Sequence, residues 1–393
     1  MRSKAIPVHG RTIAAASRGV AVLFLLPFIV GTILRLLRPK HWFVDFEALS
    51  CGGQAVYAKL PLYVWDPSCP GMKPTIYVYT PAAAKLFALL QHLLGLTGEI
   101  VLYGGVFWII VYSVFAALIR QDGRLQIRAP FLAGIPGNAL SSGNASIVIH
   151  GLIFLRGGWL AARPALAVPL IAGAAIVKPT FVVYLALFLF LNRPMRQRLL
   201  LLSVCAAIVA AYFLHFHYVD PTDFAKWQAL TGYFGLTNDR GDGFLALPAV
   251  SHLSTLPSIA ACYALFAAMV LSSGLILAEC CEDESDKVLL GIATCLLLYP
   301  RLMGYDVFTL PFGLAVAVSC FQRLGRFEAQ HLTWTVRAVC GVCGLLSLIG
   351  GRLGEKLFFG FSCLLLFFLA ATAVSAKVTA GKRRDVECGT CLP

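Results

Sequence analysis

The sequence predicts an all-α protein that crosses a membrane several times. Of its 393 residues, 59% are hydrophobic and 13% are charged, and the mean hydropathy of +0.80 lies outside the range of soluble domains. Apolar runs of about 15 to 23 residues recur along the chain, long enough for membrane helices. Runs such as "GVAVLFLLPFIVGTILRLL" do not alternate apolar and polar residues, so a transmembrane barrel is excluded.

The apolar runs predict eleven or twelve helices, some of them too short to cross a membrane alone. At a rise of ~1.5 Å per residue, a run of about 14 residues does not span ~30 Å of hydrocarbon. We therefore expect the short runs to be re-entrant or broken helices packed inside the protein. The expected segments are 19–38, 99–119, 129–141, 143–156, 163–177, 179–192, 199–217, 257–279, 287–300, 306–322, 335–350 and 356–376.

The distribution of Lys and Arg predicts the topology. Four basic residues precede the first span, and no small-residue cleavage site follows a short apolar region, so we expect a cytoplasmic, uncleaved N-terminus. Alternating crossings then place "RQDGRLQIR", "RGGWLAAR", "RPMRQR", "QRLGR" and the tail 377–393 inside, with the acidic loop "ECCEDESDK". The net charge of +13 is thus a topology signal, and no nucleic-acid partner is expected. Segments 39–98 and 218–256 become outer loops of a single transmembrane domain, 1–376.

Three basic residues, Arg35, Arg38 and Lys40, close the first span at its outer end, where the topology rule expects few positive charges. One interpretation is that they extend their charges to the membrane interface. The other is that they help to hold a phosphate.

The first outer loop begins with "WFVDFEALSCGGQAVYAKLPLYVWDP", residues 42–67, which carries two closely spaced carboxylates near its start, Asp45 and Glu47. Asp45 and Glu47 are two residues apart and do not share a helix face, so we expect only one of them to act in a given pocket. The alternative is that Asp45 merely caps or complements the charge of a helix start. Cys51 and Cys69 lie in the same polar loop and either form a disulfide or remain free thiols.

Aromatic residues crowd the segment 61–93 ahead of an amphipathic helix that starts at a proline. Tyr63, Trp65, Tyr77 and Tyr79 are typical of an interfacial belt, and the same rings could instead shape a substrate mouth. Further along, "NALSSGNASIVIHGLIFL" gives an apolar helix a polar, small-residue start that includes Asn144. Such residues often mediate helix packing in membranes.

Two later segments place charges between apolar runs. Lys178 stands in "AAIVKPTFVVYL" directly before a proline, where a broken helix would open, and its ammonium could bind a phosphate. Arg301 and Asp306 stand close together in "LLLYPRLMGYDVFTLPF", either paired with one another or serving a site. The predicted topology puts Asp45, Lys178, Arg301 and Asp306 at one membrane face. It therefore predicts a single cleft there that is lined by acidic and basic residues.

The order of these segments resembles glycosyltransferase family 87. This is a family of polytopic enzymes of the GT-C type that take a sugar from a polyprenyl phosphate, and it includes phosphatidylinositol-mannoside mannosyltransferases. The resemblance spans roughly residues 40 to 315 and rests on "VDFEALSCGGQAVYAKLPLYVWDP", "YVYTPAAAKLFALL", "GNASIVIHGLIFL" with "AGAAIVKPTFVVYLALFLFLNRP", and "YPRLMGYDVFTLPF". Lys59 and Thr80 stand where the family usually has a glycine and a proline, and Gly143-Asn144 stands where Gly-Gln is common.

The resemblance implies an inverting hexosyltransferase, with mannose the favoured sugar, acting on the periplasmic face of a bacterial plasma membrane. Asp45 would be the catalytic base, while Lys178 and Arg301 would neutralise the departing phosphate. Asp306 would position the acceptor or hold Arg301. The donor is a polyprenyl-phosphate sugar, the acceptor a lipid or glycan, and no metal or other cofactor is expected. Further substrate contacts are expected from Glu47, Tyr63, Tyr79 and Asn144.

Two other classes of function fit the same sequence. A lipid or sugar transporter would suit broken helices with a lysine between them, although such proteins usually contain inverted repeats, which the sequence does not display. A non-catalytic assembly subunit would use the acidic loop and the C-terminal tail for docking.

Overall fold

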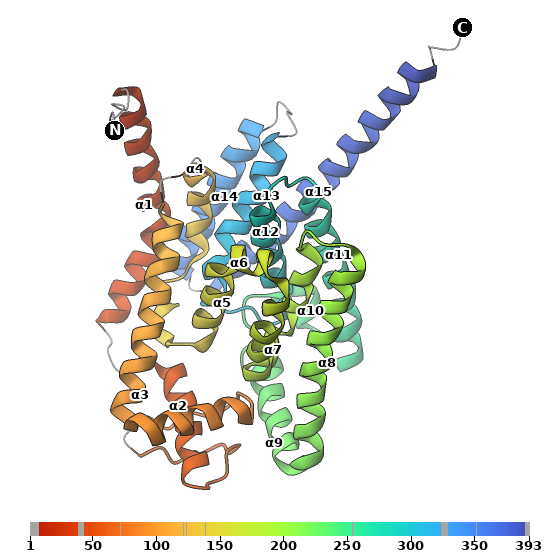
Figure 1. Ribbon diagram of the computed structural model, residues 1–393. Helices are drawn as coiled ribbons and strands as arrows, with labels where there is room; N and C mark the ends of the chain where they lie inside the picture. Colours follow the sequence, from red (N-terminus) through yellow and green to blue (C-terminus); the bar gives the residue numbers. More distant parts are fainter. Residues whose placement is uncertain are drawn as a thin grey trace, which may run out of the picture.

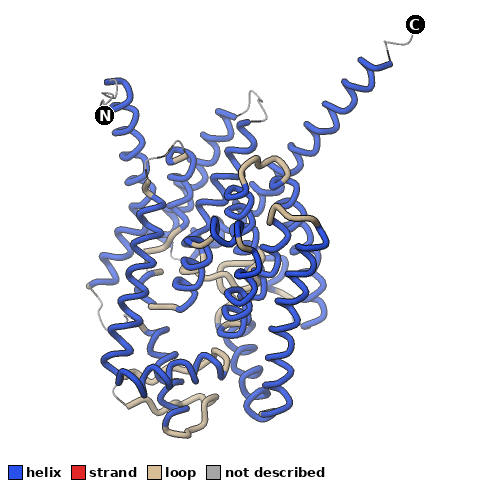
Figure 2. The backbone as a smooth tube through the Cα atoms, viewed as in Figure 1, coloured by secondary structure: helices blue, strands red, loops and turns tan. Residues whose placement is uncertain are grey.

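The computed structural model of the chain is a bundle of helices (Figures 1 and 2). The structure describes residues 8–37, 43–70, 72–120, 122, 124–137, 139–253, 255–323, 329–350 and 352–389. Over these ranges the chain forms helices joined by turns and contains no strand. The predicted all-α class is confirmed.

Six helices are long and apolar enough to cross a membrane, which confirms a multi-pass membrane protein. In α15 half of the most apolar 18-residue stretch is buried inside the protein, against 17 to 22% of the corresponding stretch in each of the other five helices. The five therefore present most of their apolar side chains outward, as helices in contact with lipid do. The six are α1 (Val8–Leu36), α3 (Pro81–Leu118), α8 (Met195–Val219), α11 (Leu256–Ala278), α14 (Ala329–Gly350) and α15 (Arg352–Gly389).

Shorter apolar helices fill the middle of the bundle and supply much of its largest buried core. They are α5 (Ala145–Leu155), α7 (Ala167–Val177), the 3₁₀ helix η5 (Pro179–Phe190), α12 (Glu284–Leu297) and α13 (Leu310–Arg323). The expectation of broken helices packed inside the protein is thus confirmed, most clearly where α7 and η5 meet at Lys178, whose backbone is extended.

Short helical turns make up the connections. They are α4 (Leu125–Arg128), η2 (Ala129–Gly134), η3 (Leu140–Ser142), α6 (Gly157–Ala162), η4 (Pro164–Leu166), the π-helical turn η6 (Tyr233–Asn238), η7 (Phe244–Ala246), α10 (Pro248–Ser251) and η8 (Val307–Thr309).

Helix α3 is two helices joined by a kink. Gly95 has a φ of +67°, a left-handed conformation that favours glycine, and it interrupts the helical backbone. The part before the kink is the amphipathic, proline-started helix that the sequence predicts. The part after it ends at Leu118 and covers the predicted span 99–119 except for its last residue.

The two predicted outer loops lie at the same end of the bundle, which we call the α2 end. Helix α2 (Val44–Tyr57) and helix α9 (Pro221–Gly232) lie there, at the end opposite to the first described turn of α1 and the last turn of α15 (Figure 1). Trp227 of α9 packs in one buried cluster with Tyr63 and Tyr77, and its indole N–H donates to the Val78 carbonyl at 3.2 Å. Helix α9 and the first loop therefore form one compact lobe, whereas the later part of the second loop packs beside α11.

A disulfide bond joins Cys51 of α2 to Cys69, which answers the question that the sequence left open. Between these cysteines Lys59 has a φ of +56°. This is a left-handed conformation, which a non-glycine residue rarely adopts.

We expect that replacing Cys51 and Cys69 together by Ser will lower stability by about 2 to 3 kcal/mol. The bond closes a loop across 18 positions of sequence, so its loss frees the unfolded chain. Thermal unfolding of the purified protein measures the effect. Cys262→Ser, at an exposed free cysteine, is the control, and equal midpoints for the two variants would contradict the prediction.

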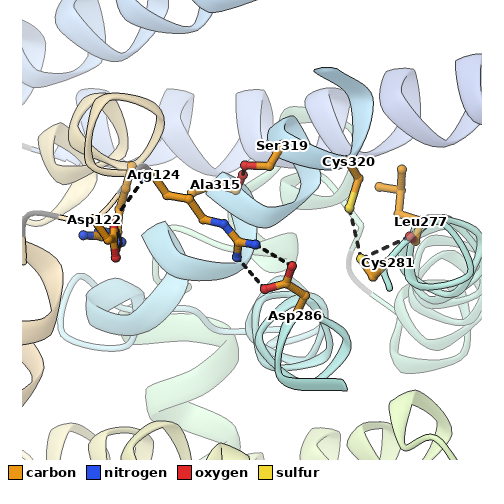
Figure 3. A network of polar contacts seen from close by, with 9 residues as sticks. Asp122, Arg124, Leu277, Cys281, Asp286, Ala315, Ser319 and Cys320 are labelled. Atoms are coloured by element: carbon orange, nitrogen blue, oxygen red, sulfur yellow. Dashed lines mark hydrogen bonds and ion pairs between the residues drawn. The ribbon is translucent and has the colours of Figure 1, made fainter. Parts of the chain in front are cut away.

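At the opposite end of the bundle, polar contacts join the α3–α4 connection to α12 (Figure 3). Arg124 forms a two-pronged ion pair with Asp286, which has an N–O distance of 2.7 Å in one of its two hydrogen bonds. Asp286 lies in the first turn of α12, where a negative charge also stabilises the helix dipole. Nearby, the thiols of Cys281 and Cys320 are 3.0 Å apart.

Candidate functional site

Five of the predicted site residues lie in one group, which we call the Asp45 cluster: Asp45, Asn144, Lys178, Arg301 and Asp306. They come from four separate segments, namely α2, the start of α5, the break between α7 and η5, and the turn before η8. Electrostatic interactions link Asp45 to Lys178 and Arg301, and Lys178 to Asp306. The predicted meeting of these four charges is thus borne out.

The start of α5 holds Asp45 in place. Asn144 is the N-cap of α5, and its side-chain oxygen accepts from the Ser146 N–H at 2.8 Å. The amide nitrogen of the same side chain donates to Asp45 Oδ2 at 2.9 Å. One asparagine therefore begins the helix and orients the carboxylate.

The residues before Asp45 are fixed by an unusual backbone. Phe43 has a φ of +57°, which is rare for a bulky residue, and its N–H donates to the Ser141 carbonyl at 2.7 Å. Its ring lies against Gly143, where a Cβ atom would come within 2.6 Å of it. Phe43 also occupies the N-cap position of α2, and Asp45 makes no capping hydrogen bond there. Asp45 is therefore not a helix cap, but it does lie in the first turn of α2, where its negative charge complements the helix dipole.

The environment of Asp45 shifts its acidity. Burial raises its pKa above the ordinary value, and the hydrogen bond from Asn144, the charge of Lys178, the Ser142 hydroxyl and the charge of Arg301 offset part of that rise. The side chain remains partly exposed. A carboxylate of this kind is a better proton acceptor than an ordinary surface aspartate.

Glu47 faces elsewhere. Burial raises its pKa, while the charge and the backbone of Lys73 lower it. Lys73 belongs to the surface turn of the first loop, so Glu47 lies apart from the Asp45 cluster. The expectation that the two carboxylates do not share a pocket is confirmed.

Lys178 is held at the break between α7 and η5. Its ammonium donates to the Ser146 hydroxyl at 2.6 Å and lies 5.3 Å from the centre of the Tyr305 ring. Thr80, at the start of α3, donates its hydroxyl to the Ile176 carbonyl at 2.5 Å. The first loop therefore docks on the turn that carries Lys178, which brings Asp45 and the ammonium to the same place.

Arg301 and Asp306 do not pair with one another. The Nε of Arg301 donates to the Asp239 carbonyl at 2.6 Å, and its guanidinium lies 3.7 Å from the Asp239 carboxylate, which also binds Arg352. Asp306 instead accepts from the Met303 N–H at 2.9 Å and contacts His150. Of the two roles expected for Asp306, holding Arg301 is wrong.

The two tyrosines expected to contact substrate lie inside the lobe at the α2 end. Tyr63 is 3% exposed and donates to the Tyr79 carbonyl at 3.0 Å, and Tyr79 is 4% exposed. Trp65, by contrast, is exposed and packs edge-on against Tyr233. Tyr63 is therefore a core residue of the lobe.

Arg35 lies in the last turn of α1, whereas Arg38 and Lys40 lie outside the described residues.

Three residues of this site are not evident from the sequence: His150, Tyr184 and Asp239. His150 is fully buried in α5, with Nδ1 2.8 Å from the Tyr184 hydroxyl and Nε2 3.1 Å from Asp306 Oδ1. Its only signal in the sequence is one histidine inside an apolar run.

Comparisons of the chain with known protein families, with curated proteins and with solved structures gave no match.

Proposed function

We propose that this protein is an inverting glycosyltransferase. It moves a hexose, with mannose favoured, from a polyprenyl-phosphate sugar to a lipid or glycan acceptor at the α2 end, which faces the outside of the cell. The observation that supports this most is the Asp45 cluster, in which a partly buried, oriented carboxylate lies near two cations. A base beside cations suits the transfer of a sugar from a phosphate.

The proposed reaction needs one proton acceptor and one anion-binding group. Asp45 takes the proton of the acceptor hydroxyl as the oxygen attacks the anomeric carbon. The bond from that carbon to the phosphate oxygen breaks, and the electron pair leaves with the phosphate. Lys178 and Arg301 stabilise the negative charge that develops there.

A single displacement of this kind inverts the anomeric carbon. A retaining mechanism uses a second carboxylate about 5 Å from the first, as a nucleophile. Glu47 lies apart from the cluster, and both oxygens of Asp306 are already engaged. The arrangement therefore favours inversion.

The direct test is a transfer assay. Purified protein in detergent is incubated with a panel of radiolabelled polyprenyl-phosphate sugars and total lipid extract, and labelled glycolipid or glycan is measured. Transfer from one donor supports the proposal.

The broken helix at Lys178 also suits a transporter. Absence of transfer from every donor, together with movement of lipid across reconstituted vesicles, would favour that function instead.

The raised pKa of Asp45 predicts the pH dependence of transfer. A base must be deprotonated, so the rate should fall as the pH drops through that pKa, at a higher pH than an ordinary aspartate would give. Asn144→Ser should move this acid limb to still higher pH, because it removes a hydrogen bond that lowers the pKa of Asp45. Serine keeps a capping oxygen for α5. Rates measured across pH for both proteins test this, and superimposable profiles would count against Asp45 as the base.

A further inference from the structure

The carboxylate of Asp306 has a partner for each of its oxygens. Oδ1 lies 3.1 Å from Nε2 of His150, and Oδ2 accepts from the Met303 N–H at 2.9 Å. His150 is fixed in turn by the Tyr184 hydroxyl, 2.8 Å from Nδ1, and by the rings of Phe181 and Tyr299 around it. Asp306 and His150 are both almost fully buried, at 1% and 0% exposed. Asp306 is therefore a buried charge with no vacant oxygen.

Lys178 lies within the electrostatic reach of Asp306 without pairing to it. Its ammonium donates to Ser146 and lies near the Tyr305 ring. Among the described residues, no ion pair joins Lys178 to Asp306, and the ion pair of Asp306 is with His150. Asp306 still attracts the ammonium through space.

Helix α5 sets this separation. Ser146 and His150 are four residues apart, so they lie on the same face of the helix, one turn from each other. The first holds Lys178 and the second holds Asp306. The helix therefore keeps Lys178 and Asp306 on separate partners.

We propose that His150 is a positioning residue that keeps Lys178 available to the phosphate of the substrate. This inference rests on the proposed function, in which Lys178 binds that phosphate. A buried carboxylate that lost its partner would need a new one, and Lys178 is the cation whose charge acts most strongly on Asp306. By occupying Asp306, His150 prevents this pairing, and the charge of Lys178 remains directed at the ligand.

Binding of a polyprenyl monophosphate, the product shared by all donors of this class, tests the role of His150. The full-length protein in detergent is titrated with this lipid, and Kd is measured for wild type, His150→Leu and His150→Gln. We expect Leu to weaken binding roughly tenfold, the effect of about 1.4 kcal/mol. Gln supplies an N–H for Asp306 and should restore most of the affinity.

A second substitution separates positioning from a merely structural effect. In His150→Leu combined with Asp306→Asn there is no carboxylate to capture Lys178, so affinity should return toward that of wild type. Asp306→Asn alone should bind at least as tightly as wild type, a result that can be read even if His150→Leu fails to fold. Gel filtration and thermal unfolding establish which variants are folded.

The outcomes are distinct. Equal affinity of folded His150→Leu and wild type would overturn the inference, as would weaker binding by Asp306→Asn alone or a double variant as weak as His150→Leu. Failure of the wild-type protein to bind any polyprenyl monophosphate would overturn the proposed function, and this inference with it.

Discussion

Replacement of Asp45 by Asn is expected to lower the rate of transfer about a hundredfold to ten-thousandfold, the range that a general base contributes. Asparagine has nearly the same shape and can still contact Asn144, so the cluster should remain assembled while the proton acceptor is lost. Affinity for the polyprenyl monophosphate should change much less than the rate, because Lys178 and Arg301 are intact. Single-turnover transfer and lipid titration measure the two effects separately.

The matched control is Asp66→Asn, at an exposed aspartate in the same loop. It makes the same chemical change at a distance from the cluster and should leave transfer unchanged. Full activity in the Asp45 variant would remove Asp45 from the role of base. In that case Glu47 and Asp306 are the remaining carboxylates to test, and the same assay applies to both.

The second large effect is expected at the other end of the bundle. Asp286→Ala should lower stability by about 3 kcal/mol or more, because it leaves the guanidinium of Arg124 without its partner in a mostly buried setting. The side chains of Arg124 and Asp286 are 30% and 4% exposed, so water cannot replace the lost hydrogen bonds fully. Thermal unfolding in detergent is the measurement, with retention of the protein on gel filtration as a check of assembly.

A surface ion pair in the same protein provides the comparison. Lys377 and Glu279 are 2.7 Å apart, but their side chains are 54% and 71% exposed. Lys377→Ala should cost less than about 1 kcal/mol, as exposed pairs typically do. If the two variants unfold at the same temperature, burial does not make the Arg124–Asp286 pair important for stability.

Much of the architecture could be predicted because lipid imposes a simple rule on sequence. Apolar runs and the positions of Lys and Arg identified the long helices and placed the two large loops at one end. The same predicted topology placed Asp45, Lys178, Arg301 and Asp306 at one membrane face, because every second connection between crossings lies on the same side.

The partners within the cluster could not be predicted, because they depend on side-chain directions rather than on periodicity. Arg301 binds Asp239, which lies in an irregular turn 62 residues earlier. The short distance in sequence between Arg301 and Asp306 therefore suggested a pairing that the structure does not contain. His150 is hidden within an apolar run. The buried positions of Tyr63 and Tyr79 likewise depend on how α9 packs over the first loop, and the sequence of the loop alone does not specify that packing.

The 3₁₀ form of η5 fixes how deep Lys178 lies in the protein. A 3₁₀ helix rises ~2.0 Å per residue and an α-helix ~1.5 Å, so twelve residues reach about 6 Å further in the 3₁₀ form. Conversion of η5 to an α-helix would draw the ammonium by that distance toward the opposite face, away from Asp45. The depth of the cation thus depends on a choice between hydrogen bonds to the third and to the fourth preceding carbonyl.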